Sequence, residues 1–472
     1  MGKKSQLFKY LVADYVAGSL AWFLYNIVRY YEIARYDGFD TLSGFLLYRN
    51  VMLGQIIVSF GWLILYYYSG YYNKIFEKSR LSEFFVTFGS VLTGTFVIFF
   101  ALLLKILPDS ILVYYEQLSY LFFFTFGFTY LFRVIITHQT ARKIRNREWT
   151  ISALILGTGE KALQIQKLLN EPSASLAYTI QGFIRIEQPS SHPVIDKQMI
   201  LSDLDNLETL IRNLNTEELI VAIDSEEDDD LLGLLYSLYQ YQLPLKLPIS
   251  HTRLLTGGVK IKAITGFPLF DVTNHNFSEA EKNIKLTLDK LISLFFLVLL
   301  SPVYLYLTLR IKSDSEGPVL IKQERIGYLG KPFMMYKFRT MQKDAEKNGP
   351  TLSSENDGRV TPFGQTMRKY RLDEIPQFWN VLKGDMSIVG PRPERKYYID
   401  QIVKQAPYFY LLHNVRPGIT SWGMVKFGYA RNIDEMIERM KYDILYYENM
   451  SLMLDLKIII YTFRTILTGK GI

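Results

Sequence analysis

The stretch that decides the fold is LISLFFLVLLSPVYLYLTL, residues 291–309, which has nineteen uncharged residues between Lys290 and Arg310. This length is close to the ~20 apolar residues that a helix needs to span a bilayer. Ser301 and Pro302 lie at its centre, and a proline inside a helix removes a backbone hydrogen bond and kinks the chain. We therefore predict two helical legs joined by a bend at these residues, with the Ser301 hydroxyl satisfying a freed carbonyl.

Four further apolar runs lie in the first third of the chain, and the first of them contains one acid, Asp14. Ten of the fifteen basic residues before position 150 flank these runs on one side, and basic residues in short loops stay cytoplasmic. The pattern predicts four membrane spans with both ends in the cytoplasm, and it does not fit a cleavable signal peptide. The four runs are 10–28, 51–73, 84–104 and 117–132.

The number of preceding membrane spans indicates whether the fifth run crosses the bilayer or returns to the same side. If residues 291–309 crossed the membrane, everything after them would lie outside, away from the activated nucleotides of the cell. A bend at Ser301 and Pro302 avoids this, because it returns both ends to the cytoplasmic face. We therefore expect a re-entrant membrane helix.

Between residues 150 and 283 the pattern becomes that of an α/β domain. Ile151–Leu156 is a β-branched apolar run, and a Gly157-Thr158-Gly159 turn and a helical period follow it. Further strand-like runs at 180–186, 219–223 and 244–248 alternate with helical stretches, which predicts a Rossmann-like parallel sheet. The acidic residue expected at the end of a second strand is missing, and Glu187 comes too late for it. We expect a regulatory or dimer-forming module, and hence a homodimer, in preference to a ligand-binding domain.

Composition excludes several classes of protein. Hydrophobic residues make up 49% and charged residues 21%, which excludes a disordered chain. Cysteine is absent, which excludes disulfides, thiolate catalysis and Cys-ligated metal sites. The middle region has 10 basic and 18 acidic residues, whereas residues 310–472 have 26 and 18. The basic excess therefore lies beside the bent apolar run, where we expect phosphates and membrane lipid as partners and no nucleic acid.

The densest polar cluster is RKYRLDEIPQ, residues 368–377. Pro376 can open a helix and Gly384 can close it, so Asp373 and Glu374 are expected at a helix N-terminus beside Arg368 and Arg371. One carboxylate can attack a phosphoryl centre while the other holds a divalent cation. The alternative is a pair of carboxylates that only forms salt bridges at the start of a helix.

Three segments each present an Arg. One follows a strand-like run, Lys337-Phe338-Arg339-Thr340-Met341, and two are fixed by Gly and Pro, Val389-Gly390-Pro391-Arg392-Pro393-Glu394 and Arg416-Pro417-Gly418-Ile419-Thr420. Guanidinium groups on rigid turns are typical of sites for planar, multiply charged groups such as a diphosphate. A basic surface that contacts anionic lipid is the competing interpretation.

These motifs, together with the broken apolar run, resemble the bacterial sugar transferase domain of the monotopic phosphoglycosyl transferases. The four apolar runs and the Rossmann-like region are similar to the long form of that family, the undecaprenyl-phosphate glucose or galactose phosphotransferases. The resemblance covers nearly the whole chain, with the diagnostic motifs in about the last 190 residues.

The resemblance implies transfer of a sugar 1-phosphate from a UDP-sugar to undecaprenyl phosphate with release of UMP, as the first membrane step of exopolysaccharide, capsule or O-antigen synthesis. It implies that Asp373 is the nucleophile and that Glu374 helps to place Mg²⁺. It also implies that the catalytic domain lies on the cytoplasmic face of the bacterial inner membrane. By the same resemblance, the nucleotide or its phosphates would contact Lys337, Arg339, Arg368, Arg371, Pro391, Arg392, Pro393 and Arg416.

We thus expect three parts: a four-span bundle at 1–149, a Rossmann-like domain at 150–283, and the re-entrant helix with an α/β catalytic domain at 284–472. The run 452–467 is either an interfacial helix or an ordinary core helix. The alternative function is a non-catalytic membrane scaffold or nucleotide sensor. An epimerase or dehydratase is disfavoured because no Tyr-x-x-x-Lys accompanies the glycine turn.

Overall fold

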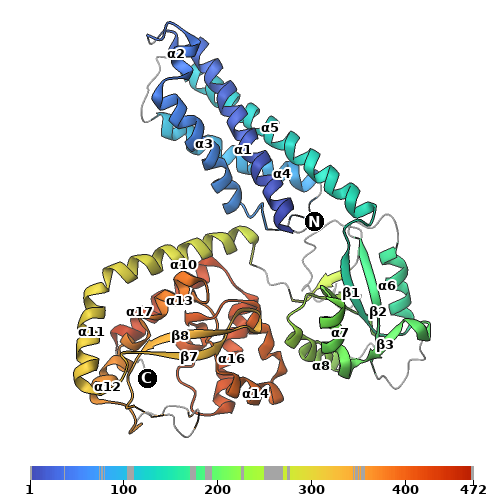
Figure 1. Ribbon diagram of the computed structural model, residues 1–472, viewed down its shortest axis with the longest axis vertical. Coiled ribbons are helices and arrows are strands. Elements are labelled where there is room, and N and C mark those ends of the chain that lie inside the picture. The colour runs from blue at the N-terminus through green and yellow to red at the C-terminus, as the bar shows by residue number, and fades with distance from the viewer. Residues whose placement is uncertain are drawn as a thin grey trace. The chain divides into compact units, whose positions relative to one another are not determined.

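The computed structural model describes most of the chain, in the ranges 3–36, 38–73, 80–103, 111–170, 177–186, 194–224, 228–248, 269–273, 277–343 and 357–468, with residues 75, 78, 345, 349 and 351. The chain divides into two compact units (Figure 1), each described by itself below. The first contains residues 3–150 together with Ala177 and Ser278–Ile284, and the second contains the remaining described residues from Ile151 onward. Glu187, which follows the second predicted strand, lies outside the described ranges.

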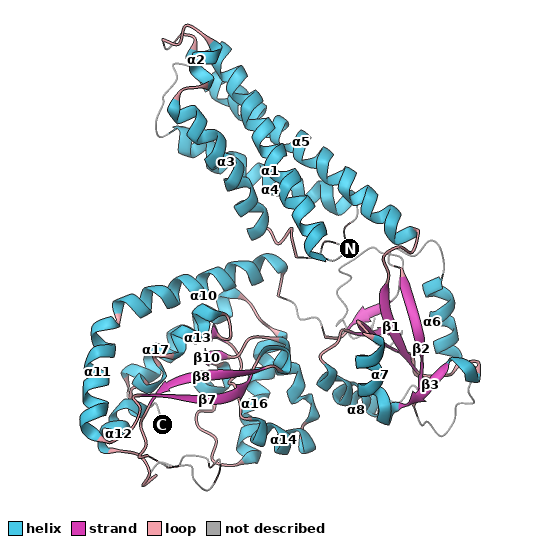
Figure 2. Ribbon diagram, in the orientation of Figure 1, coloured by secondary structure: helices cyan, strands magenta, loops and turns pink. Residues whose placement is uncertain are grey.

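The first unit is a helical bundle (Figure 2). Its helices are α1 (Lys3–Arg29), which continues into the π-helical turn η1 (Tyr30–Ala34), α2 (Leu42–Leu46), α3 (Arg49–Tyr68), α4 (Arg80–Leu103) and α5 (Ile111–Arg145). Among the described residues, four single helices are long and apolar enough to cross a membrane, and they coincide with the four predicted runs. The prediction of four apolar helices is confirmed.

Charged residues inside this bundle neutralise one another. Arg133 of α5 and Asp14 of α1 are both fully buried. The Arg133 guanidinium donates to both Asp14 oxygens, at 2.8 and 2.9 Å, and also to Thr87 of α4 at 2.9 Å. An ionised group among apolar helices is destabilising unless it is paired, so this pair explains why an acid is tolerated in the first apolar helix.

The second unit begins with a six-stranded sheet whose order is β3-β2-β1-β4-β5-β6. The contacts β1 to β2, β2 to β3, β1 to β4 and β4 to β5 are parallel, and β6 is antiparallel to β5. The predicted parallel α/β sheet is therefore confirmed. Its elements are β1 (Ile151–Leu156), α6 (Glu160–Asn170), β2 (Tyr178–Arg185), β3 (Ile200–Asp203), α7 (Leu207–Leu214), β4 (Glu218–Val221), α8 (Asp228–Leu238), β5 (Leu245–Pro248) and β6 (Leu269–Asp271).

The C-terminal part is mainly helical (Figure 1) and contains two small sheets. The antiparallel pair is β7 (Leu320–Ile326) with β8 (Pro332–Phe338), and the parallel pair is β9 (Ser387–Val389) with β10 (Gly418–Thr420). The helices are α10 (Glu279–Leu299), α11 (Ser301–Asp314), α12 (Pro362–Lys369), α13 (Gln377–Lys383), α14 (Lys396–Gln405), α15 (Trp422–Lys426), α16 (Ile433–Glu448) and α17 (Leu452–Leu467).

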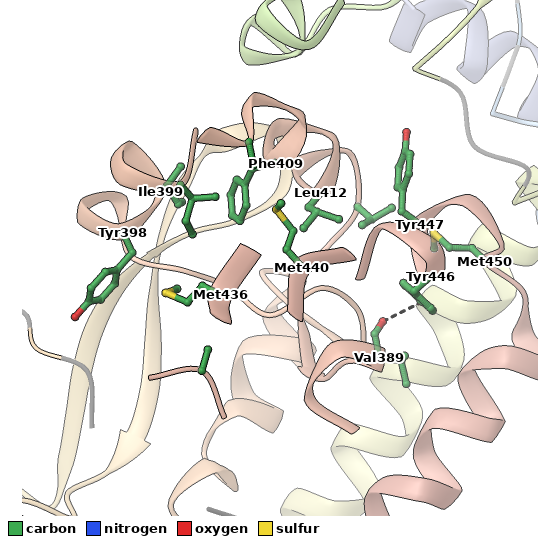
Figure 3. Close-up of a cluster of buried hydrophobic side chains, with 14 of the residues drawn as sticks. Val389, Tyr398, Ile399, Phe409, Leu412, Met436, Met440, Tyr446, Tyr447 and Met450 are labelled. Atoms are coloured by element: carbon green, nitrogen blue, oxygen red, sulfur yellow. Dashed lines mark hydrogen bonds between the residues drawn. The ribbon is translucent and has the colours of Figure 1, made fainter. Parts of the chain in front are cut away.

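A buried apolar cluster joins the helices of this part (Figure 3). Met436 and Met440 of α16 pack with Ile399 of α14 and with Phe409 from the 3-10 segment η7 (Pro407–Asn414). Val389 of β9 belongs to the same cluster. The strand that leads into the Pro-Arg-Pro loop is therefore part of the core.

The apolar run 291–309 is broken where the sequence predicts it. Helices α10 and α11 meet at Leu300 with a bend of 61°. The Ser301 hydroxyl donates to the Val298 carbonyl at 2.7 Å, which is the contact predicted for it. Pro302 lies in the first turn of α11, where its missing N–H has no helical partner to lose. The proline therefore starts a second helix and does not kink the interior of a single one.

Large apolar side chains remain exposed on the helices around this bend. On α10 and α11 they include Leu291, Leu294, Phe295, Val298, Leu305, Tyr306 and Leu309. Helix α17 has a buried side with Asp455 and Ile458, and an exposed apolar side with Met453, Leu456, Ile460, Phe463 and Leu467. An apolar surface of this extent is typical of a site that contacts lipid or protein. Helix α17 therefore has one side in the core, and its other side is apolar and exposed.

Candidate active site

The Asp373-Glu374 pair lies in the 3-10 turn η6 (Leu372–Glu374) between α12 and α13. Arg371, which precedes the turn, has a left-handed backbone with φ of +53°. Pro376 is the N-cap of α13, and Gly384 closes this helix at φ +91°, as predicted. The carboxylates themselves lie in the turn before α13 and not in its first turn. The turn presents Asp373 and Glu374 to different surroundings.

Glu374 is held by cations. Its Oε1 accepts from Lys337 Nζ at 3.0 Å, and its Oε2 accepts from Arg371 at 3.3 Å. Arg392 lies 3.9 Å from Oε1. Burial raises the pKa of Glu374, but Lys337, Arg371 and Arg392 together hold it well below its usual range. Glu374 is therefore ionised at neutral pH.

Asp373 has a different environment although it is the neighbouring residue. It is buried, and among the described residues its carboxylate makes no hydrogen bond or ion pair. Burial and the Glu374 charge raise its pKa to about 6, against the opposing effect of Lys337, Arg368 and Arg371. A desolvated carboxylate without a partner that titrates near neutrality is typical of a reactive group.

Asp373 lines a cavity of about 160 Å³. Six cationic side chains line it as well, against two carboxylates: Arg325, Lys337, Arg368, Arg392, Arg395 and Arg439, with Asp373 and Glu394. Arg439 donates to Glu394 at 2.5 Å, and Arg325 lies 3.4 Å from it. Glu394 is therefore neutralised by its partners, and the lining of the cavity is cationic. In the described part of the chain, Asp373 is the lining carboxylate that has no ion-pair partner. A cationic wall of this kind fits a diphosphate.

The structure brings four of the predicted residues to this cavity: Lys337, Arg368, Arg392 and Asp373. Arg368 is oriented by Thr340, whose hydroxyl accepts from its Nε at 3.0 Å. Glu374 and Arg371 lie behind the wall, as the ion-pair partners given above. These residues form one site, to which β8, α12, the η6 turn and the Pro-Arg-Pro loop contribute.

The remaining predicted residues lie outside the cavity lining. Arg339 donates to the Ile311 and Ser315 carbonyls at 3.3 and 2.5 Å, at the end of α11. Arg416 donates to the Gly384 carbonyl at 3.0 Å and lies over the Tyr328 ring.

The predicted residues Pro391 and Pro393 hold the Pro-Arg-Pro loop in place through hydrogen bonds to their backbone carbonyls. The carbonyl of Pro391 accepts from the Gly418 N–H at 2.9 Å. The carbonyl of Pro393 accepts from Arg325 at 3.0 Å. Both contacts fix the loop that presents Arg392.

Sequence reasoning missed several lining residues. Glu394 and Arg395 directly follow the Pro-Arg-Pro turn, and that adjacency was a usable signal. Arg439 lies within the amphipathic helix α16, where its pattern is that of any surface helix. Tyr398 and Tyr429, which line the cavity too, had no motif to mark them.

The residues present do not by themselves fit a magnesium site. In the part of the chain that the structure describes, there is no group of three or more His, Cys, Asp or Glu side chains placed to hold a metal ion. Both Glu374 oxygens already accept from cations, so a metal would have to displace Lys337 or Arg371.

Comparisons with known proteins indicate the family of this chain. The family described as "Bacterial sugar transferase" matches residues 280–469, and the family described as "CoA-binding domain" matches residues 70–245. The chain is 39% identical over 248 residues to the UDP-N-acetylgalactosamine-undecaprenyl-phosphate N-acetylgalactosaminephosphotransferase of Aeromonas hydrophila, over 52% of this chain and 58% of that protein.

Two further relatives extend the comparison. The UDP-glucose:undecaprenyl-phosphate glucose-1-phosphate transferase of Klebsiella pneumoniae is 37% identical, over 44% of each chain. The match thus spans about half the length of these first two relatives. The uncharacterized sugar transferase EpsL of Bacillus subtilis is 38% identical over 40% of this chain and 90% of its own length. The chain belongs to the bacterial sugar transferase family, in the long form that carries membrane helices and an α/β domain before the transferase part.

Proposed function

We propose that the protein transfers a sugar 1-phosphate from a UDP-sugar to undecaprenyl phosphate, with release of UMP, as the first membrane step of exopolysaccharide, capsule or O-antigen synthesis. The observation that carries the proposal is Asp373, a buried carboxylate without an ion-pair partner among the described residues, in the wall of a cavity lined by six cations. The names of the Aeromonas and Klebsiella relatives give the two substrate classes.

In the first step, an Asp373 oxygen attacks the phosphorus that carries the sugar. The bond from that phosphorus to the bridging oxygen breaks, and UMP leaves with the bridging oxygen and its electron pair. Sugar phosphate is then bound to the carboxylate as an acyl phosphate. A covalent intermediate divides one transfer between a soluble and a lipid substrate into two easier steps.

In the second step, a phosphate oxygen of the lipid attacks the same phosphorus. The bond between phosphorus and Asp373 breaks, and the carboxylate returns to its ionised form. The product is a lipid-linked sugar diphosphate. The anionic lipid supplies its own nucleophilic oxygen, so no general base is needed for this step.

The cations of the cavity have two tasks in this scheme. Lys337, Arg368 and Arg392 line the cavity and stabilise the charge on the diphosphate oxygens. Glu374 fixes two of them, Lys337 by an ion pair of 3.0 Å and Arg392 at 3.9 Å. Mg²⁺ is proposed as a cofactor that would enter with the diphosphate of the UDP-sugar and not through a protein site of its own, and loss of UMP release on addition of EDTA tests this.

We further propose that the transferase part rests on the cytoplasmic face of the bacterial inner membrane, with α10 and α11 entering and leaving on that face. The 61° bend and the exposed apolar residues near it support this placement. A reporter fused to the C-terminus should read cytoplasmic, and a periplasmic reading would contradict the re-entrant arrangement. A homodimer is also proposed, and light scattering in detergent measures it.

The activity itself is tested by incubating the purified protein with undecaprenyl phosphate and, in turn, UDP-N-acetylgalactosamine, UDP-glucose and UDP-galactose. UMP release that requires Asp373 supports the proposal and identifies the sugar. The alternative, a non-catalytic scaffold or nucleotide sensor, predicts no UMP release with any of these sugars.

A further inference from the structure

Helix α10 carries two buried charges on a helix whose other side is apolar. Lys285 and Asp289 are one turn apart, their charged atoms are 3.8 Å apart, and their side chains are 12% and 11% exposed. Leu288 and Leu291, close in sequence, are exposed apolar residues. Apolar side chains at these positions could attach the helix to the domain equally well, because a buried ion pair is seldom more stabilising than an apolar contact. The two charges are therefore better explained by the directed hydrogen bonds that they form.

Both charges bind the same strand. Asp289 accepts from the Ser387 hydroxyl at 2.6 Å and from the Ile388 N–H at 3.3 Å. Lys285 donates to the Val389 carbonyl at 3.0 Å. Each residue of the three-residue strand β9 is therefore hydrogen-bonded by α10.

The Val389 carbonyl is also bound from the core side. The Tyr446 hydroxyl of α16 lies 3.4 Å from it (Figure 3) and donates its hydrogen to Asp455 of α17 at 2.7 Å. Asp455 in turn accepts from Lys285 at 2.6 Å. The position of the strand is thus fixed by hydrogen bonds with defined directions.

Strand β9 leads within three residues to Arg392, which lines the cavity. The connecting residue Gly390 is closely confined, because a Cβ there would overlap the Arg416 carbonyl oxygen. The Arg392 N–H donates to Asp443 of α16 at 3.4 Å. A loop held this tightly has little freedom of its own, so a shift of β9 moves Arg392.

We propose that Lys285 and Asp289 are positioning residues, which set Arg392 relative to Asp373 and transmit the placement of α10 to the diphosphate site. The proposal rests on the proposed function. An error of about 1 Å in the placement of a charged group has a large effect on phosphoryl transfer, which gives the hydrogen bonds their purpose.

Asp289→Asn tests this, with Asp400→Asn as the matched control. Asp400 is an exposed carboxylate on α14 that pairs with Lys396. The amide introduced by Asp289→Asn can still accept one hydrogen bond, but it lacks the charge and the second acceptor oxygen. We expect kcat/KM for the UDP-sugar to fall about 10- to 100-fold in the Asp289 variant and to stay unchanged in the control, with the same unfolding midpoint in both.

A double variant separates positioning from general damage. In the background of Arg392→Ala, the Asp289 change should have little further effect, because the group through which it acts is gone. Unchanged kinetics in the single variant, fully additive losses in the double variant, or a loss that follows the unfolded fraction would each overturn the proposal.

Amide hydrogen exchange gives a readout that does not depend on activity. The Ile388 amide and the amides from Gly390 to Arg392, excluding the proline, should exchange faster in Asp289→Asn than in the wild type or in Asp400→Asn. Equal exchange in all three proteins would overturn the positioning role even if the protein proved to have no transferase activity. If the wild type releases no UMP but the exchange differs, only the proposed function fails.

A separate observation concerns the glycine turn of the sheet domain. Asp224, three residues beyond β4, accepts from the Glu160 N–H at 3.1 Å and from the Lys161 N–H at 2.9 Å. These amides are in the first turn of α6, where a dinucleotide fold binds phosphate. A Cβ on Gly159 would overlap an Asp224 oxygen, so the small residue makes room for this carboxylate.

We infer that Asp224 closes the phosphate position of this domain, so that no CoA or nucleotide phosphate binds there. Hydrogen exchange at Glu160 and Lys161 tests this on the full chain, with CoA and ADP as probes. We expect no protection by either probe in the wild type, and faster exchange of both amides in Asp224→Ala. Protection of these amides in the wild type by CoA or ADP, or unchanged exchange in the variant, would overturn the inference.

Discussion

Lys337 on β8 donates a hydrogen bond of 3.0 Å to Glu374 in the η6 turn, so the two motifs with the most charge in the transferase part meet in one ion pair. Lys337 also lines the cavity, whereas Glu374 does not. The carboxylate therefore holds the cation in place, and the cation faces the cavity. The neighbouring Asp373 carboxylate also lines the cavity and has no ion-pair partner among the described residues.

Removal of this cation should reduce the first step strongly. In Lys337→Met, the diphosphate loses a charge partner and Asp373 loses one of the cations that counteract the rise of its pKa. We expect a loss of about 100- to 1000-fold in the rate of UMP release. Lys322→Met, an exposed lysine on the partner strand β7, is the control and should keep its activity. Equal activity in both variants would contradict the role of Lys337.

The first step should depend on one ionisation near pH 6. Asp373 attacks as a carboxylate, and its pKa is raised to about 6, so the rate should be constant above that pH and fall as the pH decreases through it. Single-turnover release of UMP between pH 5 and 8 measures this. In Lys337→Met the acid limb should move to higher pH, because a cation that favours the charged form has been removed. A profile that is flat from pH 5 to 8 would contradict the assignment.

Asp373 should also destabilise the folded protein at neutral pH. Its folded pKa of about 6 lies above the ordinary value of 3.8, so folding favours the protonated form, and the ionised form above pH 6 carries the full penalty. Asp373→Asn should therefore raise the free energy of unfolding at pH 8 by about 1–3 kcal/mol. The difference should shrink as the pH falls through 6 towards 4. An Asn variant that is less stable than the wild type at pH 8 would refute this.

Arg339 should matter for folding more than for substrate affinity. It is 5% exposed, and one guanidinium nitrogen, Nη2, donates to two carbonyls at the end of α11, a position that the differently shaped lysine amine does not reproduce. We expect Arg339→Lys to lower the free energy of unfolding by about 1–3 kcal/mol, with an unchanged KM for the UDP-sugar in the folded fraction. Arg368→Lys, in the cavity wall, should do the opposite. A raised KM with unchanged stability in the Arg339 variant would show that it contacts phosphate.

The features predictable from sequence were those encoded locally. The bend at Ser301 and Pro302 and the caps of α13 depend on residues a few positions apart, so uncharged runs and turn chemistry are sufficient to find them. Contacts between distant residues leave no such trace. Asp14 and Arg133 are 119 positions apart, and each looks like an isolated exception in an apolar helix.

The missed parts of the site have the same cause. Arg439 reaches Glu394 from 45 positions away, on a helix whose pattern predicts only a buried face. Asp224 comes 64 positions after Glu160, and a search for an acid after the second strand does not consider it. The basic motif around Arg339 predicts a phosphate contact, and the sequence gives no sign that its guanidinium reaches the end of α11.

The most direct measurement for the central claim is mass spectrometry of the protein after incubation with a UDP-sugar and no lipid acceptor. The account predicts release of up to one UMP per protein and a mass increase of one sugar phosphate, located on the peptide that contains Asp373. The increase should disappear on addition of undecaprenyl phosphate and should be absent in Asp373→Asn. Turnover with both substrates in the absence of any covalent adduct, or an adduct on another residue, would contradict it.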